Sequence, residues 1–328
     1  MRGFVFSPVS LQKGSDRMTA LEVALEFAII VFVGILVVRV RLVGPEFRSQ
    51  LAKFVTNAAL PCMIARSLYS QEDRFEGMGR IFLLAVLMVL LLLLAGWLLY
   101  RALGKTEIAV SARFSLMFGN FTFMGFPIVE NLYGAAGLFA FTLFTMPVRL
   151  AFYSSPAFLL RPRDSSSAKF SWKTLGKQFL SPPILAVFAG LVMYALRWQP
   201  PLFLDKAVQA LGGSASMLGM LLVGMGMADA TPKSLWQRRR VMVIVLSKAI
   251  LCPLLLLALF YFYPLDSLTK QALFLYGAVP VPSLLTAFSL NEGRSAEACQ
   301  DASAAVLLST LLSVLILPVW AAVGARLL

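Results

Sequence analysis

Two strongly apolar stretches of this chain are interrupted by glycine, proline and small polar residues. The first interruption covers residues 119–127 and the second covers residues 277–283. Proline cannot donate a backbone hydrogen bond and glycine relaxes the helical backbone, so both leave peptide groups without helical partners. No water replaces those partners inside a bilayer, and such peptide must face protein or a wet cavity. The available chemistry is recognition of a guest molecule by peptide dipoles and polar side chains, as at the broken helices of transporters.

Each interruption carries polar side chains that could contact such a guest. If the two segments cross, four half-helix ends meet, and two of them are N-termini with roughly half a unit of positive charge each. These N-termini suit an anion. The alternative is that glycine and proline only kink ordinary membrane helices, in which both are common. The predicted substrate-binding residues are Asn57, Pro61, Gly119, Asn120, Thr122, Gly125, Pro127, Arg149, Gly277, Pro280, Pro282 and Ser283.

Polar and charged residues inside apolar segments need a structural or a functional reason. Asn57 either lines the cavity together with Pro61 or bonds to a neighbouring helix. Arg149 lies well inside a segment, where a charge costs about 2.5–3.5 kcal/mol, and it either pairs with an acid or carbonyls or serves as a ligand group. Lys248 is nearer the end of its segment and can snorkel to the surface. Both cations favour a negatively charged substrate.

Acids able to carry a coupling proton are few. Glu130 and Asp229 end their apolar segments, and these two acids together with Lys248 are predicted to be coupling or structural charges. Glu26 and Asp301 are predicted to lie near the membrane surface. No residue is identified as a proton carrier, so H+ and Na+ both stay candidates for the coupling ion.

Composition places the chain among integral membrane proteins. Of its 328 residues, 59% are hydrophobic and 14% are charged, whereas soluble domains are about 45–50% apolar. The chain has 29 Lys and Arg against 16 Asp and Glu, and the basic residues cluster in short loops, as the positive-inside rule predicts. No nucleic-acid partner is therefore expected. Histidine is absent and the three cysteines are far apart, so no metal, cofactor or enzymatic triad is expected.

Ten apolar runs predict an all-α protein with ten membrane spans, five in each half. Because five is odd, the second half starts from the opposite side and is inverted relative to the first. The predicted parts are a tail at 1–18, a first repeat at 19–160, a basic cytoplasmic connector at 161–178 and a second repeat at 179–328. The loop cations predict a multi-pass protein of the inner, plasma membrane with both termini outside the cytoplasm. The predicted spans are 20–38, 50–69, 81–100, 112–132, 136–160, 179–197, 205–229, 240–263, 270–290 and 302–325.

Several of these segments resemble the auxin efflux carrier family. The resemblance lies in residues 54–61, 119–134, 181–184, 246–253 and 308–313, and the second of these is the most specific. It implies ten helices in two inverted repeats with crossing fourth and ninth helices, similar to bile-acid transporters, and elevator-type alternating access. It also implies organic-anion carriage, with auxin as the substrate of plant relatives and malonate or malate as substrates of bacterial ones. Lys248 falls on a lysine of the family's eighth helix.

The prediction is therefore a secondary active transporter, and not an enzyme, that carries small organic anions such as malonate or other carboxylates. The alternatives are an anion channel or a membrane-embedded sensor of the same fold. No nucleotide-binding loop of the Gly-x-x-x-x-Gly-Lys type occurs, so energy comes from an ion or substrate gradient. The expected partners are the anion, the coupling ion and the lipid bilayer, and a homodimer stays open.

Overall fold

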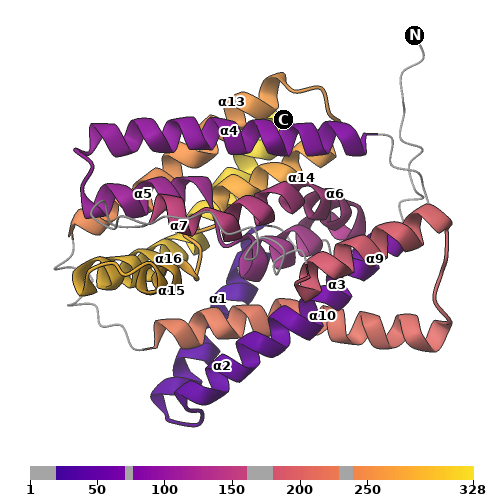
Figure 1. Ribbon diagram of the computed structural model, residues 1–328. Helices are drawn as coiled ribbons and strands as arrows, with labels where there is room; N and C mark the ends of the chain where they lie inside the picture. The colour runs from indigo at the N-terminus through magenta and orange to yellow at the C-terminus, as the bar shows by residue number, and fades with distance from the viewer. Residues whose placement is uncertain (1–19, 71–76, 161–179, 229–238) are drawn as a thin grey trace.

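Helices are the regular secondary structure of all the described residues, and no strand occurs among them (Figure 1). The computed structural model describes residues 20–70, 77–160, 180–228 and 239–328. The predicted tail at 1–18 and connector at 161–178 lie outside this part of the chain. The prediction of an all-α protein is confirmed for the described residues.

The helices follow one another along each half of the chain. In the first half they are α1 (Ala20–Arg39), α2 (Pro45–Phe54), the π-helix η1 (Val55–Ala59), α3 (Leu60–Tyr69), α4 (Met78–Ala102), α5 (Glu107–Met117), the π-helix η2 (Phe121–Gly125), α6 (Phe126–Ser154) and α7 (Pro156–Leu159). In the second half they are α9 (Pro182–Leu196), α10 (Leu202–Met227), the 3-10 helix η3 (Arg239–Val241), α12 (Met242–Leu246), the π-helix η4 (Ser247–Leu251), α13 (Cys252–Phe262), α14 (Ser267–Ala278), α15 (Leu285–Asn291) and α16 (Ala296–Leu327).

Five helical segments of the described chain are long and apolar enough to cross a membrane. Shorter apolar helices accompany them at Ala28–Arg39 and Pro182–Leu196. Large apolar side chains point outward along these helices, as Leu90 and Leu94 do on α4 with 56% exposure each. Such a surface requires lipid around it, so the chain is a multi-pass membrane protein. The five segments are Met78–Ala102, Glu107–Phe152, Leu202–Gly226, Arg239–Phe262 and Ala296–Leu327.

Helix α6 folds back on itself at Gly134. This glycine has φ 64° and ψ −161°, which is outside the helical range. Phe126 and Phe141 lie on opposite sides of it, and their ring centroids are 5.4 Å apart. In a straight helix these residues would be roughly 22 Å apart, so the chain must reverse. The predicted fourth span, 112–132, therefore covers the end of α5, the residues between α5 and η2, η2 itself and the first arm of α6. The predicted fifth span, 136–160, begins in the second arm of α6.

Three π-helical turns are explained by prolines that follow them. In each, the residue before the proline donates its N–H to the carbonyl five residues earlier, as Leu60 does to Val55. The proline itself cannot donate to the carbonyl four residues earlier, which loses its helical partner. After η4 this carbonyl belongs to Ala249, and the indole N–H of Trp320 donates to it at 2.9 Å. The three turns and their prolines are η1 with Pro61, η2 with Pro127 and η4 with Pro253.

The helices pack into two units that each draw on both halves of the sequence. We call them the α10 unit (α1, α2, η1, α3, α9 and α10) and the α16 unit (α4 to α6 with η2, and η3 to α16), since helices pack mainly within these groups. In Figure 1, α3, α9 and α10 lie together at the lower right, below α4 and α6 of the α16 unit. Glycines bring α1 and α10 into backbone contact, because a Cβ on Gly34 would overlap the carbonyl of Leu221.

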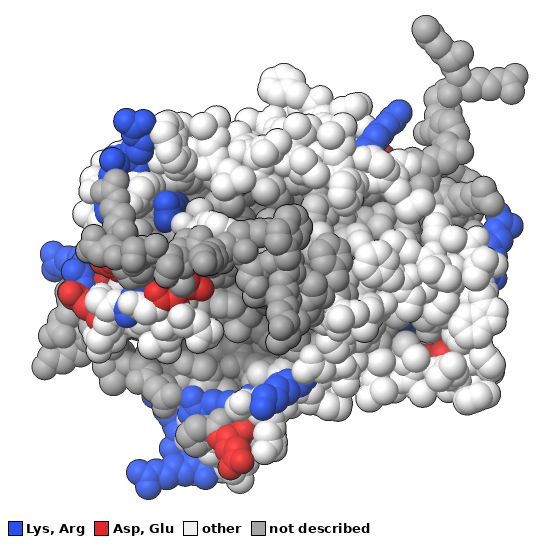
Figure 2. Space-filling model, viewed as in Figure 1, with Lys and Arg blue, Asp and Glu red and all other residues white. Residues whose placement is uncertain are grey.

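Basic side chains gather at one end of the molecule. Figure 2 shows Lys and Arg over the end at which α4 leads into α5, and again over α2, with fewer at the opposite end of the visible face. Arg101 lies in the last turn of α4 and Lys105 in the connection to α5, while Arg39 ends α1 and Arg41 lies in the connection to α2. Charge is therefore unequal between the two ends, as the positive-inside pattern predicts.

Candidate functional site

Two helices stop within the protein and leave extended backbone. Helix α5 is capped by Thr106, whose side chain accepts from the N–H of Ala109, and it ends at Phe118, which is extended. Helix α14 has the same design, with a cap at Asp266 and an extended end at Val279. The chain becomes helical again at η2 and at α15. The two breaks are therefore residues 118–120 and 279–284. The first begins one residue before the predicted interruption at 119–127 and is much shorter, and the second begins two residues after the start of the predicted interruption at 277–283.

The two breaks contact each other directly. The N–H of Asn120 donates to the carbonyl of Pro280 at 2.8 Å. The hydroxyl of Tyr276 donates to the carbonyl of Met117 at 2.9 Å. Gly119 permits this approach, because a Cβ there would lie 2.5 Å from a methyl group of Val279. Unwound peptide from one half of the chain thus satisfies unwound peptide from the other half, as burial in a membrane demands.

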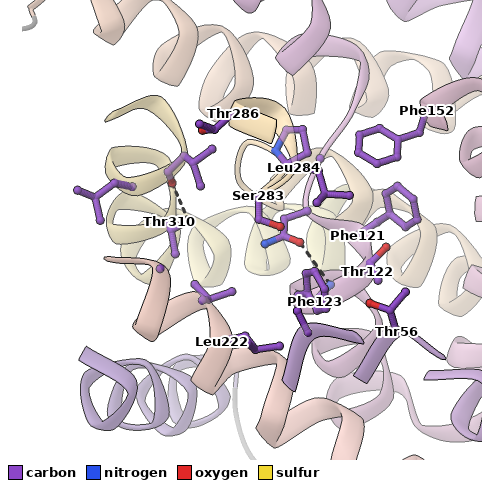
Figure 3. A pocket seen from close by; sticks show the side chains of 18 of the residues that line it. Thr56, Phe121, Thr122, Phe123, Phe152, Leu222, Ser283, Leu284, Thr286 and Thr310 are labelled. Carbon is purple, nitrogen blue, oxygen red and sulfur yellow. Dashed lines mark hydrogen bonds between the residues drawn. The ribbon is translucent and has the colours of Figure 1, made fainter. Parts of the chain in front are cut away.

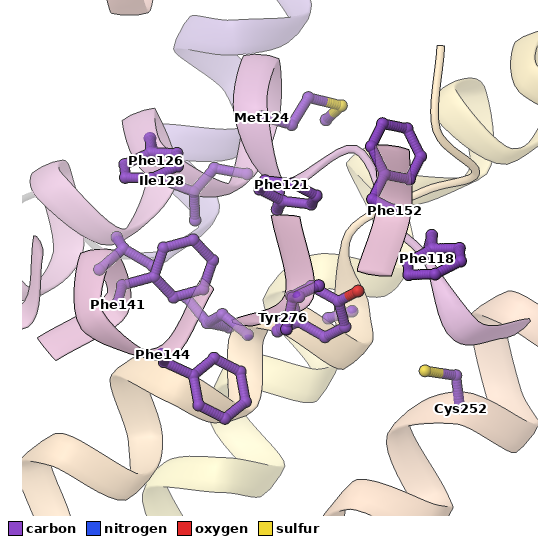
Figure 4. Close-up of a cluster of buried hydrophobic side chains, with 14 of the residues drawn as sticks. Phe118, Phe121, Met124, Phe126, Ile128, Phe141, Phe144, Phe152, Cys252 and Tyr276 are labelled. Carbon is purple, nitrogen blue, oxygen red and sulfur yellow. The ribbon is translucent and has the colours of Figure 1, made fainter. Parts of the chain in front are cut away.

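Aromatic side chains enclose the contact between the breaks. Figure 4 shows Phe121 and Phe152 beside Tyr276 in a buried cluster. The rings of Phe121 and Phe152 meet edge to face at 5.8 Å between centroids, and those of Phe121 and Tyr276 are 6.1 Å apart. Paired aromatic rings add about 0.5–1.5 kcal/mol each beyond the area that they bury. This cluster gives the broken backbone a firm support.

Asn120 has one satisfied and one unsatisfied side-chain group. Its Oδ1 accepts a hydrogen bond from the N–H of Phe123 at 3.3 Å and so caps η2. Its Nδ2 is buried and finds no hydrogen-bond acceptor among the described residues. The whole residue is only 3% exposed. A buried amide donor without an acceptor is costly in a protein interior, and this one has none among the described residues.

The unsatisfied amide lies at a cavity of about 630 Å³ that both breaks help to line. Figure 3 shows Thr56, Leu222 and Thr310 around this space, each on a different helix, with Ser283 between them. Residues three and four apart share a helix face, and both α2–η1 and α16 turn such faces to the cavity. The face of α2–η1 consists of Ser49, Ala52, Lys53, Thr56 and Asn57, and that of α16 consists of Ser303, Val306, Leu307 and Thr310.

The cavity wall combines apolar surface with neutral hydrogen-bonding groups and one cation. Hydroxyl and amide side chains come from α2–η1, both breaks, α15 and α16. Phe121, Phe123, Phe152 and Leu222 supply apolar surface. Lys53 is the one charged side chain among the described residues of the lining, and no carboxylate belongs to it. Such a wall suits an anion with an apolar body.

The structure brings half of the predicted binding residues to this cavity. The lining includes Asn57, Gly119, Asn120, Thr122, Pro282 and Ser283. It does not include Pro61, Gly125, Pro127, Arg149, Gly277 or Pro280. Pro61 and Pro127 lie in the first turns of α3 and α6, a position where proline fits a helix well. Pro280 serves the breaks through its carbonyl. A binding role for any of these residues stays a prediction.

The two predicted membrane cations are buried outside the lining. Arg149 is 4% exposed, and its guanidinium carbon lies 5.6 Å from the centre of the Phe121 ring. Lys248 is 1% exposed; its ammonium group donates to the sulfur of Cys252 at 3.5 Å and lies 5.2 Å from the centre of the Tyr276 ring. The interpretation that Lys248 snorkels to the surface is therefore wrong, because its side chain is buried.

Glu130, predicted to be a coupling or structural charge, does not line the cavity. Glu130 is half-buried on α6, and Asp229 lies outside the described residues. Sequence reasoning missed Lys53, Thr56, Ser303 and Thr310 as lining residues. A signal was present in the spacing of Ser49, Lys53 and Thr56, which places small polar groups and one cation on a single helix face.

A family model described as membrane transport protein matches residues 19–321. The chain belongs to this family, the auxin efflux carriers. An uncharacterized transporter of Methanothermobacter thermautotrophicus is similar, with 23% identity over 323 residues that cover 93% of this chain and 99% of the relative. The resemblance seen in the sequence is thereby confirmed, and the carrier is a multi-pass membrane protein of a transport family.

Proposed function

We propose that this auxin efflux carrier family member is a secondary active transporter of small organic anions, such as malonate or other carboxylates. The observation that carries the proposal is the Nδ2 group of Asn120, a buried donor that has no acceptor in the described part of the chain and belongs to a residue lining a cavity of about 630 Å³. A carboxylate oxygen is the acceptor that this donor lacks. The bond is worth more with a charged acceptor than with a neutral one.

Helix polarity supports an anion at the same place. Asn120 caps the start of η2, which continues into the first arm of α6. The N-terminal end of a helix carries partial positive charge and free N–H groups, and both favour a negative ligand. The absence of any carboxylate from the described lining removes the group that would repel it. Serine and threonine hydroxyls of the lining supply further donors.

We infer an arrangement of ten membrane helices in two inverted five-helix repeats. Support comes from α5 and α14, each of which is capped by a side chain, ends in extended backbone and meets the other at the Asn120–Pro280 hydrogen bond. The cavity lies between the α10 unit and the α16 unit, because both contribute to its lining. Movement of one unit against the other would carry the site across the membrane, which is elevator-type alternating access.

We also infer that the basic end of the molecule faces the cytoplasm of a cell with this carrier in its plasma membrane. Lys53 at the cavity lies on α2, which belongs to that end (Figure 2). The cavity then opens inward, and the termini lie outside the cytoplasm. An H+ or Na+ gradient is the proposed source of energy, because the sequence has no nucleotide-binding loop.

Uptake into proteoliposomes tests the function. Purified carrier should give saturable uptake of radiolabelled malonate or of a monocarboxylate identified by ligand-induced thermal stabilisation. Asn120→Ala should reduce this uptake, and Asn131→Ala should not, since Asn131 lies on α6 with an exposed side chain outside the lining. Absence of uptake for every anion that stabilises the protein would contradict a carrier. Conductance far above carrier turnover would instead establish a channel.

A further inference from the structure

Lys53 is a cation with no partner in the described part of the chain. It lies in the last turn of α2, is exposed, and is one of the residues that line the cavity. No hydrogen bond or ion pair joins its ammonium group to any described residue. The ammonium group is therefore available to a mobile ligand, whereas the ammonium group of Lys248 is enclosed by Cys252 and Tyr276.

Lys53 lies on the face of α2 that lines the cavity, and not on the face that carries the exposed phenylalanines. Successive helical residues are about 100° apart around the axis. Phe47 and Phe54 lie on one face of α2, each 44% exposed, and Lys53 lies about 100° from Phe54 around the helix. The neighbours of Lys53 on its own face, Ser49 and Thr56, line the cavity with it. A lysine that served only the membrane surface would not need this face.

The apolar surroundings of the cavity strengthen the electrostatic attraction of Lys53 for an anion. Apolar walls concentrate the field of a charge in a cleft and raise the local concentration of counter-ions. No carboxylate among the described lining residues opposes Lys53. Its flexible stem and three N–H donors let it follow a moving anion without dictating its shape.

We propose that Lys53 is the residue that makes the cavity selective for negative charge. It attracts the carboxylate from the α10 unit, and Asn120 then holds that carboxylate at the break in the α16 unit. This role rests on the proposed function, since it assigns the charge recognition of that same site. Lys53 thus attracts the anion into the cavity, while Asn120 positions the carboxylate once the anion is bound.

Proteoliposome uptake of a labelled carboxylate at several salt concentrations tests this role. Lys53→Gln should raise KM by about tenfold, leave kcat within about twofold and flatten the dependence of uptake on salt. Lys53→Arg should restore KM because the charge returns. Lys53→Glu should abolish uptake of the anion. The matched control is Lys105→Gln, which removes the same charge from the same end of the molecule but outside the lining.

The outcomes separate the two proposals. If the unaltered carrier moves no carboxylate, the proposed function fails before Lys53 is tested. If it moves a carboxylate while Lys53→Gln keeps the original KM and salt dependence, the role of Lys53 is wrong and the function stands. An equal rise of KM in Lys105→Gln would also overturn this role, because it would reflect surface charge in general. Unchanged thermal stability of Lys53→Gln and recovery in Lys53→Arg exclude a folding defect as the cause.

Discussion

A single asparagine joins the architecture of the break to its chemistry. Asn120 caps η2 through Oδ1, donates its backbone N–H to the carbonyl of Pro280 in the other half, and has an Nδ2 group without an acceptor among the described residues. Alanine at this position removes all side-chain roles together, so it cannot separate stability from binding. Aspartate keeps an oxygen for the cap and replaces only the amide donor.

Asn120→Asp should therefore preserve the fold and lose the substrate. Its carboxylate can still accept from the N–H of Phe123, and a negative charge at a helix N-terminus is favourable. The same charge repels a substrate anion and removes a hydrogen bond worth about 1.5–3 kcal/mol to a charged acceptor. We expect KM to rise by an order of magnitude or more with little change in thermal stability. Uptake by Asn120→Asp at the original KM would show that Nδ2 does not contact the anion.

Glycine is required at position 119 by the close contact between the breaks and not by its backbone conformation, because its φ is not positive. A Cβ there would lie 2.5 Å from Cγ2 of Val279 and 3.0 Å from Nζ of Lys248. Gly119→Ala should cost about 1–3 kcal/mol, the usual range for overpacking. Val279→Ala in the same molecule removes the clashing methyl and should restore much of the loss. Thermal unfolding in detergent measures both.

Gly79→Ala is the control for that pair, because nothing lies within 4 Å of a Cβ at Gly79. If Gly119→Ala is as stable as Gly79→Ala, the two breaks do not approach as closely as described. If Val279→Ala fails to improve Gly119→Ala, the clash lies elsewhere, and the ammonium group of Lys248 is then the next neighbour to consider.

At the scale of the elements, backbone contact holds the helices of the α10 unit together. Gly212 on α10 faces α3, and a Cβ there would lie 2.9 Å from the backbone of Met63. The adjacent Gly213 has nothing within 4 Å of such a Cβ. Both glycines lie inside the same helix, so alanine changes helix propensity equally at the two positions.

Gly212→Ala should consequently destabilise the carrier, and Gly213→Ala should stabilise it slightly. The expected loss at Gly212 is about 1–3 kcal/mol, because backbone atoms cannot move aside as a side chain can. The expected gain at Gly213 is up to about 1 kcal/mol from helix propensity. Chemical or thermal unfolding of the two variants in the same detergent checks the difference, and equal stabilities would contradict the close packing of α3 on α10.

The sequence predicts some of these elements well and others not at all. Gly119, Asn120, Pro280 and Pro282 mark both breaks, because glycine and proline act locally on the backbone. Residues 121–127 were predicted as part of the first break but are helical, because Pro127 fits the first turn of α6. The spacing of Ser49, Lys53 and Thr56 predicts one polar helix face, but that this face lines a cavity together with α16 depends on the tertiary fold, which no local pattern contains.

The π turns and the surroundings of Arg149 also depend on tertiary contacts that the local sequence does not contain. A proline within an apolar stretch predicts a lost hydrogen bond, but whether the helix kinks, breaks or widens depends on partners such as Trp320, whose indole serves the free carbonyl of Ala249. Arg149 is where the sequence places it, inside an apolar segment, yet its aromatic surroundings come from residues that reach it only through the fold.

At the scale of the molecule, the cavity lies at the boundary between the two packing units. Each unit contains helices from both halves of the chain, so the halves cannot move as separate bodies. Ion pairing occurs within a unit, as between Arg66 on α3 and Asp205 on α10, whose charged atoms are 3.1 Å apart. The cavity, in contrast, is shared between the units. Relative motion of the units would therefore change access to the site while leaving each unit intact.

Cross-linking across that boundary should stop transport, and cross-linking within a unit should not. Leu222 on α10 and Thr310 on α16 line the cavity from the two units, so a bifunctional thiol reagent that bridges Leu222→Cys and Thr310→Cys should arrest uptake of the anion. The control bridges Arg66→Cys and Asp205→Cys, which replaces an ion pair inside the α10 unit. Both pairs belong in a Cys62→Ser background, because Cys62 is the least buried of the three natural cysteines. Since a bridge at the cavity can also obstruct the substrate, reagents of increasing length are needed; uptake that returns with a longer, flexible bridge supports motion between the units, whereas full uptake with the shortest bridge in place would contradict it.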